Sequence, residues 1–62
     1  MQSIIEVLEH LPITTKIVRS VRGETLRDAA KSIGVSFATL SRLESGKPCN
    51  LDTAIRVLKW IE

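Results

Sequence analysis

One glycine, Gly34, separates two segments of helical spacing and constrains the fold of this chain more than any other residue. The apolar residues before it recur every three or four positions, and they are Leu26, Ala29, Ala30 and Ile33. Those after it follow the same spacing, and they are Phe37, Leu40 and Leu43. Glycine can take the left-handed conformation that ends a helix, and Ser36 can cap the next helix with its hydroxyl. Residues 25–47 are therefore predicted to form two helices joined by a tight turn.

The turn is short, because only residues 34–36 join the two helices. The helices must then cross steeply, and the small side chains of Ala29 and Ala30 leave room for a close crossing. This arrangement is a helix-turn-helix, whose second helix can enter the major groove of DNA.

Cap and stop signals divide the rest of the chain into further helices. Ser3 and Glu6 have capping-box spacing, and Pro12 ends the first helix and can open the second. Thr25 and Asn50 can cap later helices. No strand-like alternation is present in the sequence. We therefore expect one all-α domain over residues 1–62, with helices at about 3–11, 13–22, 26–33, 37–44 and 51–61.

Helical projection assigns a buried face to each outer helix. For the first helix these residues are Ile4, Val7, Leu8 and Leu11; for the second, Ile13, Ile17 and Val21; for the last, Leu51, Ala54, Ile55, Leu58 and Ile61. Val57 and Trp60 fall outside the last face. The end of the chain, with Val57, Trp60 and Ile61, is therefore a candidate dimer interface. The alternative is that the first helix covers Trp60.

Positive charge gathers around the two central helices. The chain carries a net charge of +2, but residues 12–50 hold seven basic and three acidic residues, a local balance of +4. The first eleven residues hold Glu6 and Glu9 and no basic residue. This distribution fits an anionic partner or an ordinary solvated surface.

Residue types for catalysis or metal binding are scarce. His10 is the only histidine and Cys49 the only cysteine, and neither has a second ligand nearby in the sequence. We therefore expect no enzyme activity, metal, cofactor or small-molecule ligand. The lone cysteine and the lack of an apolar run long enough for a membrane span or a signal peptide favour a cytoplasmic location.

Several of these residues together resemble a known family, the Cro and phage-repressor type of helix-turn-helix, also called xenobiotic-response-element-like. The matching positions are Ala30, Gly34, Val35, Leu40 and Leu43, the Glu44, Ser45, Gly46, Lys47 ending, and Arg19 and Gly23 upstream. The resemblance covers about residues 13–61. It implies a compact five-helix, lambda-repressor-like domain that binds double-stranded DNA and represses transcription. Because one such unit reads few base pairs, we expect a homodimer, at least on DNA, at an inverted-repeat operator.

The resemblance also implies a base-reading set on residues 37–44. Helix geometry and the family pattern together give Phe37, Ala38, Thr39 and Arg42. Arg42 is the strongest candidate, because a guanidinium can donate two hydrogen bonds to guanine, although it could instead reach phosphate only. Phe37 could read a thymine methyl or could be a core residue.

Phosphate contacts need donors at the rim of the groove and at helix N-termini. The expected set is Thr25, Arg27, Ser36, Ser41, Lys47 and Asn50. By resemblance, Arg19 and Glu44 should form an ion pair that locks the groove helix to its scaffold; otherwise they are two unrelated surface charges. The alternative function is a protein-interaction module, such as an antitoxin or anti-repressor, that uses the helix-turn-helix only as a scaffold.

Overall fold

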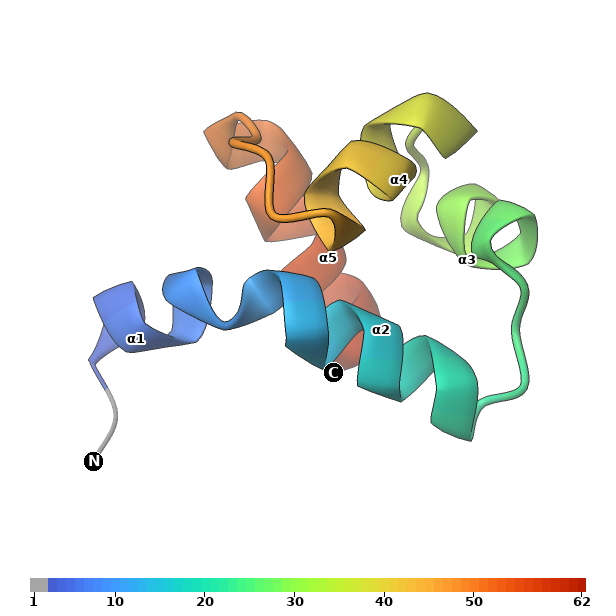
Figure 1. Cartoon of the computed structure of the whole chain (residues 1–62), viewed down its shortest axis with the longest axis horizontal. Helices are drawn as coiled ribbons and strands as arrows, with labels where there is room; N and C mark the ends of the chain where they lie inside the picture. Colours follow the sequence, from blue (N-terminus) through green and yellow to red (C-terminus); the bar gives the residue numbers. More distant parts are fainter. Residues whose placement is uncertain (1–2) are drawn as a thin grey trace.

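Side-chain caps set the start of four helices in the computed structural model, which describes residues 3–62 (Figure 1). Each capping oxygen accepts a hydrogen bond from the backbone N–H three residues later, at 2.8 to 3.2 Å, and the caps are Ser3, Thr25, Ser36 and Asn50. The helices are α1 (Ile4–Glu9), α2 (Leu11–Val21), α3 (Leu26–Ile33), α4 (Phe37–Glu44) and α5 (Leu51–Ile61). The expected all-α fold with five helices is confirmed, and the last three ranges match.

The junction between the first two helices lies earlier than expected. The backbone N–H of Thr14 donates to the carbonyl of His10 at 2.9 Å, so α2 begins at Leu11 rather than at residue 13. Pro12 lies in the first turn of α2, where a backbone N–H would have no hydrogen-bond partner within the helix, so proline costs nothing there. Leu11 therefore belongs to α2, and α1 contributes no fully buried residue to the core.

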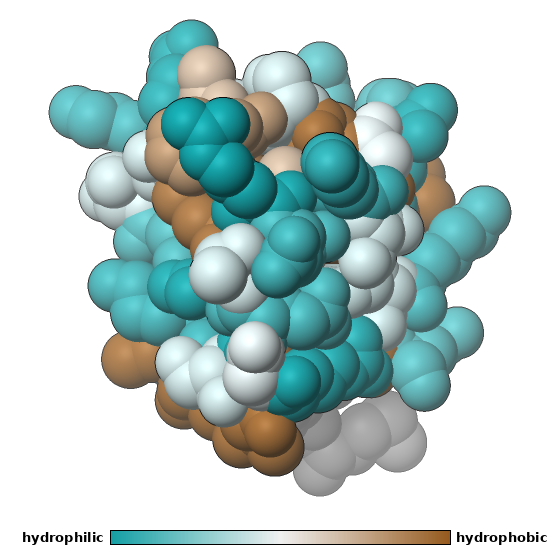
Figure 2. Space-filling model, turned by 90° about the vertical axis from the view of Figure 1, so that its right-hand side faces the viewer, coloured by the Kyte–Doolittle hydropathy of each residue, from teal (hydrophilic) through white to brown (hydrophobic). Residues whose placement is uncertain are grey.

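The expected inner face of α2 is wrong, because the helix is turned the other way. Ile13, Ile17 and Val21 are 57%, 55% and 82% exposed. The buried face instead holds Leu11 and Thr15. Thr15 tolerates burial because its hydroxyl donates to the carbonyl of Leu11 at 2.7 Å. Figure 2 shows apolar atoms along the lower edge of the molecule, where α2 lies in Figure 1.

The expected faces of α1 and α5 are only partly right. In α1, Ile4 and Leu8 are exposed. In α5, Ala54, Leu58 and Ile61 face the core as expected. Leu51 and Ile55 are exposed instead, and Val57 is completely buried. The buried apolar core comprises Leu11, Ala29, Ala30, Ile33, Leu40, Leu43, Ala54 and Val57.

The candidate dimer interface at the end of α5 is therefore wrong for Val57, which has no surface to offer a partner. Trp60 and Ile61 are half-buried and pack against the core. Arg22 covers Trp60, with its guanidinium carbon 4.8 Å from the ring centroid. The same guanidinium donates to the carbonyls of Trp60 and Ile61 at 3.0 and 3.3 Å. The Trp60 ring is thus covered by Arg22, at the C-terminal end of α2, whereas Glu6 and Val7 of α1 line a hollow with Leu58 and Ile61.

The two central helices lie on one side of this scaffold. In Figure 1, α1 and α2 run along the bottom of the view, α3 and α4 lie above α2, and α5 passes behind. Both α2 and α5 pack against the α3–α4 pair. Between residues 3 and 62, the helices are all too short or too polar to cross a membrane.

Candidate nucleic-acid interface

The turn between α3 and α4 has the geometry that its glycine allows. Gly34 has φ +91°, and the N–H groups of Gly34 and Val35 both donate to the carbonyl of Ala30, at 2.9 and 3.0 Å. Ala29 and Ala30 are buried at the helix crossing, and Leu40 of α4 is fully buried. This packing fixes which side of α4 faces outward.

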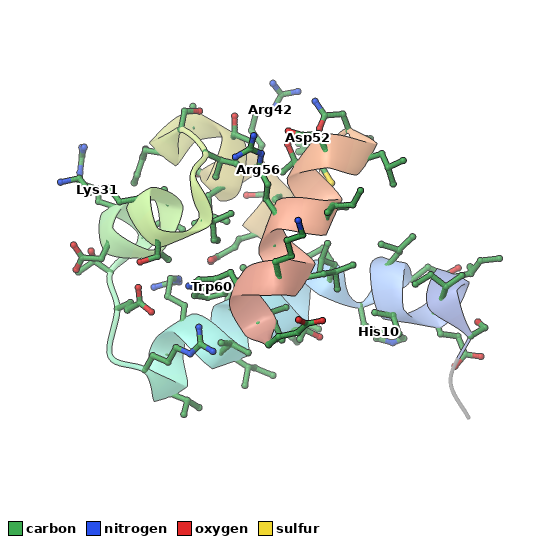
Figure 3. All side chains as sticks on the ribbon, turned by 180° about the vertical axis from the view of Figure 1, so that it is seen from behind. His10, Lys31, Arg42, Asp52, Arg56 and Trp60 are labelled. Carbon is green, nitrogen blue, oxygen red and sulfur yellow. The ribbon has the colours of Figure 1, made fainter. Side chains whose placement is uncertain are left out.

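The outward side of α4 carries Arg42, which is exposed and points away from the body of the protein (Figure 3). Neither ion pair among residues 3–62 involves Arg42. One turn earlier, the Ser36 hydroxyl donates to the Thr39 hydroxyl oxygen at 2.8 Å. Thr39 therefore keeps its own hydroxyl proton for another acceptor.

A polar hollow of about 180 Å³ joins α4 to the start of α5. Its wall includes Thr39 and Arg42 from α4 and Asn50 from the cap of α5. Thr39 and Arg42 belong to the expected base-reading set and Asn50 to the expected phosphate set, and the structure brings them together. Thr53 also lines the hollow and was missed. The available signal was its spacing from Asn50, because the third residue of a helix lies on the same side as the residue that caps the helix.

A second hollow lies at the N-termini of α3 and α4. The guanidinium carbon of Arg27 is 4.6 Å from the centroid of the Phe37 ring. Thr25 and Lys31 line the same hollow. Phe37 is 42% exposed, so it is not part of the core. Lys31 is a basic residue outside the expected phosphate-contacting set. Its position one helical turn after Arg27 was the available signal that the two side chains lie together.

Arg19 and Glu44 form the expected ion pair. Arg19 Nε and Nη2 donate to Glu44 Oε2 and Oε1 at 2.9 and 3.0 Å, and Nη1 donates to the carbonyl of Glu24 at 3.3 Å. The hydrogen bond with Glu44 raises the pKa of Arg19 above its ordinary value. The pair ties the end of α4 to α2 and leaves the Glu44 side chain only 7% exposed.

The remaining predicted site residues are spread more widely. Ala38 is exposed on α4, and Ser41 is half-buried. Lys47 is exposed in the loop after α4 but does not line the polar hollow. Over residues 3–62, His, Cys, Asp and Glu side chains form no group that could hold a metal ion.

Comparison with family models, with curated proteins and with solved structures finds no match to this chain. The geometry of the residues therefore carries the functional argument.

Proposed function

We propose that this chain is a sequence-specific, double-stranded DNA-binding transcriptional regulator, most similar to a phage Cro-like repressor. Helix α4 enters the major groove, and two copies bind an inverted repeat, because one helix of eight residues reads only a few base pairs. On this proposal, the chain is a member of the Cro and phage-repressor type of helix-turn-helix family. It acts in the cytoplasm.

The observation that carries the proposal is the outward face of α4. Arg42 and Thr39 lie beside Asn50 in one polar hollow, so base-edge donors and a phosphate donor share a surface. A guanidinium there can donate two hydrogen bonds to guanine O6 and N7. Apolar Ala38 on the same helix suits contact with a thymine methyl.

The second hollow supplies phosphate contacts on the other side of α4. Arg27 and Lys31 place two positive charges there against the one negative charge of Asp28, next to the N-terminal N–H groups of α3. Stacking on Phe37 holds the Arg27 guanidinium in place while its N–H groups remain available. Phosphate donors on both sides of α4, with Asn50 in the polar hollow and Arg27 and Lys31 in the second, fit the two phosphate backbones that border a major groove.

Selection of bound sequences from random duplex DNA tests the proposal. The expected result is an inverted repeat whose half-site centres are about one helical turn, roughly 34 Å, apart. The affinity for that sequence should fall steeply as salt rises, because bound phosphates release counterions. Absence of any enriched sequence, together with no binding to duplex DNA at low salt, would exclude this function.

One observation favours a second candidate, a protein-interaction module such as an antitoxin or anti-repressor. Ile13, Ile17 and Val21 form an exposed apolar stripe on α2, away from the polar hollow. This candidate predicts a stoichiometric complex with a protein partner that is unchanged by Arg42→Ala. The DNA-binding function predicts that the same substitution weakens binding to the selected DNA.

A further inference from the structure

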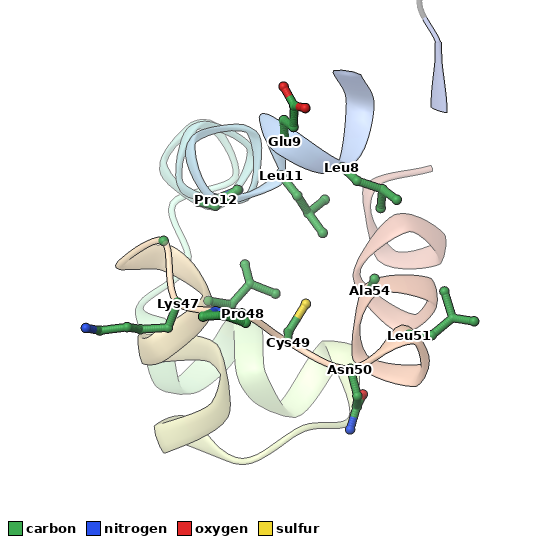
Figure 4. Close-up of a pocket in the computed structure, with 12 residues that line it drawn as sticks. Leu8, Glu9, Leu11, Pro12, Lys47, Pro48, Cys49, Asn50, Leu51 and Ala54 are labelled. Atoms are coloured by element: carbon green, nitrogen blue, oxygen red, sulfur yellow. The ribbon is translucent and has the colours of Figure 1, made fainter. Parts of the chain in front are cut away.

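An apolar groove of about 480 Å³ opens between the α1–α2 junction and the loop before α5 (Figure 4). Its inner wall is made of core residues, including Leu11, Leu43 and Ala54. At its rim, Leu8 is 37% exposed and Leu51 is 71% exposed. The groove thus continues the core outward to an exposed apolar rim.

We propose that a second copy of this chain docks in this groove about a two-fold axis. A two-fold interface must be self-complementary, so each copy needs both a cavity and a side chain that fills it. Leu51 points outward beside the groove in Figure 4, and a two-fold rotation can place it in the groove of the other copy. Ile55, one turn later on α5 and 42% exposed, extends the same apolar ridge.

The charges at the groove fit the same symmetry. Glu9 and Lys47 line the groove from α1 and from the loop after α4, and their side chains point outward in different directions in Figure 4. A two-fold axis can bring Glu9 of each copy opposite Lys47 of the other, which makes two complementary pairs. Lys47 then faces the partner rather than phosphate, in keeping with its place outside the polar hollow.

The position of the groove favours a second copy over other occupants, and this step rests on the proposed function. Pro48, Cys49 and Asn50 line both the groove and the polar hollow beside Arg42. A copy docked in the groove therefore lies beside the DNA-facing surface, where both α4 helices can reach one duplex. The apolar stripe of α2 shares no residue with that hollow.

Sedimentation equilibrium of the whole chain without DNA, at concentrations up to the order of 1 mM, tests this surface. We expect a concentration-dependent dimer whose Kd rises about tenfold or more with Leu51→Lys, since a charge would enter an apolar groove. Ile17→Lys is the matched control, because it places the same charge on the exposed stripe of α2 and should leave Kd unchanged. Circular dichroism establishes that both variants are folded.

Charge reversal gives a second, independent readout. Glu9→Lys and Lys47→Glu should each raise the dimer Kd, and the double variant should restore it. A chain that stays monomeric over the whole range, a dimer unaffected by Leu51→Lys, or one disrupted equally by Ile17→Lys overturns the proposal. Because no DNA is present, Arg42→Ala leaves the dimer intact, so failure of DNA binding and failure of this interface are separate results.

Discussion

Arg19 and Glu44, 25 positions apart in the sequence, face each other through two hydrogen bonds of 2.9 and 3.0 Å. Glu44→Gln should destabilise the fold by about 1–3 kcal/mol, because it removes the charged partner of the Arg19 side chain, which is only 21% exposed. Urea unfolding followed by circular dichroism measures this loss. Arg19 stays charged at all ordinary pH values, because its raised pKa means that its contribution is lost only in strong alkali.

The matched control is the ion pair of Arg56 with Asp52 on the exposed side of α5, where Arg56 Nε lies 2.8 Å from Asp52 Oδ2. Asp52→Asn should cost no more than about 0.5 kcal/mol, because water screens this pair. Equal losses from the two substitutions would mean that the Arg19–Glu44 pair does not hold α4 on its scaffold.

The orientation of α2 is open to a direct test with two residues of its first turn. Leu11→Ala should destabilise the fold by about 2–5 kcal/mol, because the buried side chain leaves a cavity. Ile13→Ala should change stability by no more than about 0.5 kcal/mol, because Ile13 is exposed. Urea unfolding measures both. The reverse order would mean that the expected face, with Ile13 inward, is the correct one.

The central part of the fold was predictable because several local signals agree there. The caps at Thr25 and Ser36 set where the two helices begin, the left-handed Gly34 makes the turn between them, and the small Ala29 and Ala30 are buried where the helices cross. Local chemistry and helical spacing fix such features without knowledge of the rest of the chain.

The outer helices were less predictable by the same means, since apolar spacing alone chose the wrong face of α2 and only part of the right face of α5. In α2, Thr15 is buried because its hydroxyl bonds within the helix, and Arg19 turns inward to meet Glu44. Projection counts both as polar and so assigns them to solvent. In the candidate site, the meeting of Thr39 and Arg42 with Asn50 depends on how α5 packs against α4, which no local pattern encodes.

Replacing Arg22 should change the fluorescence of Trp60, the only tryptophan in the sequence, because Arg22 covers its ring. Arg22→Ala removes both the cation above Trp60 and the hydrogen bonds to the carbonyls of Trp60 and Ile61. We expect Trp60 emission to shift to longer wavelength and stability to fall by about 0.5–2 kcal/mol. Lys16→Ala, which removes a charge from the exposed side of α2, should leave the emission unchanged. An unshifted spectrum for Arg22→Ala would contradict the packing of Arg22 on the ring.

If Arg42 reads bases and Arg27 binds phosphate, their replacement should change DNA affinity in two different ways. Arg42→Ala should lower affinity for the selected sequence by about 5- to 150-fold and relax the choice of base at one position. Arg27→Ala should weaken all sequences alike and reduce the slope of log K against log salt by about one. Fluorescence anisotropy at several salt concentrations separates the two effects. Lys59→Ala is the control, because it removes one positive charge from a hollow on α5 that is lined by neither Arg42 nor Arg27. If all three substitutions weaken binding equally at every sequence, the attraction is only general charge, and α4 does not read bases.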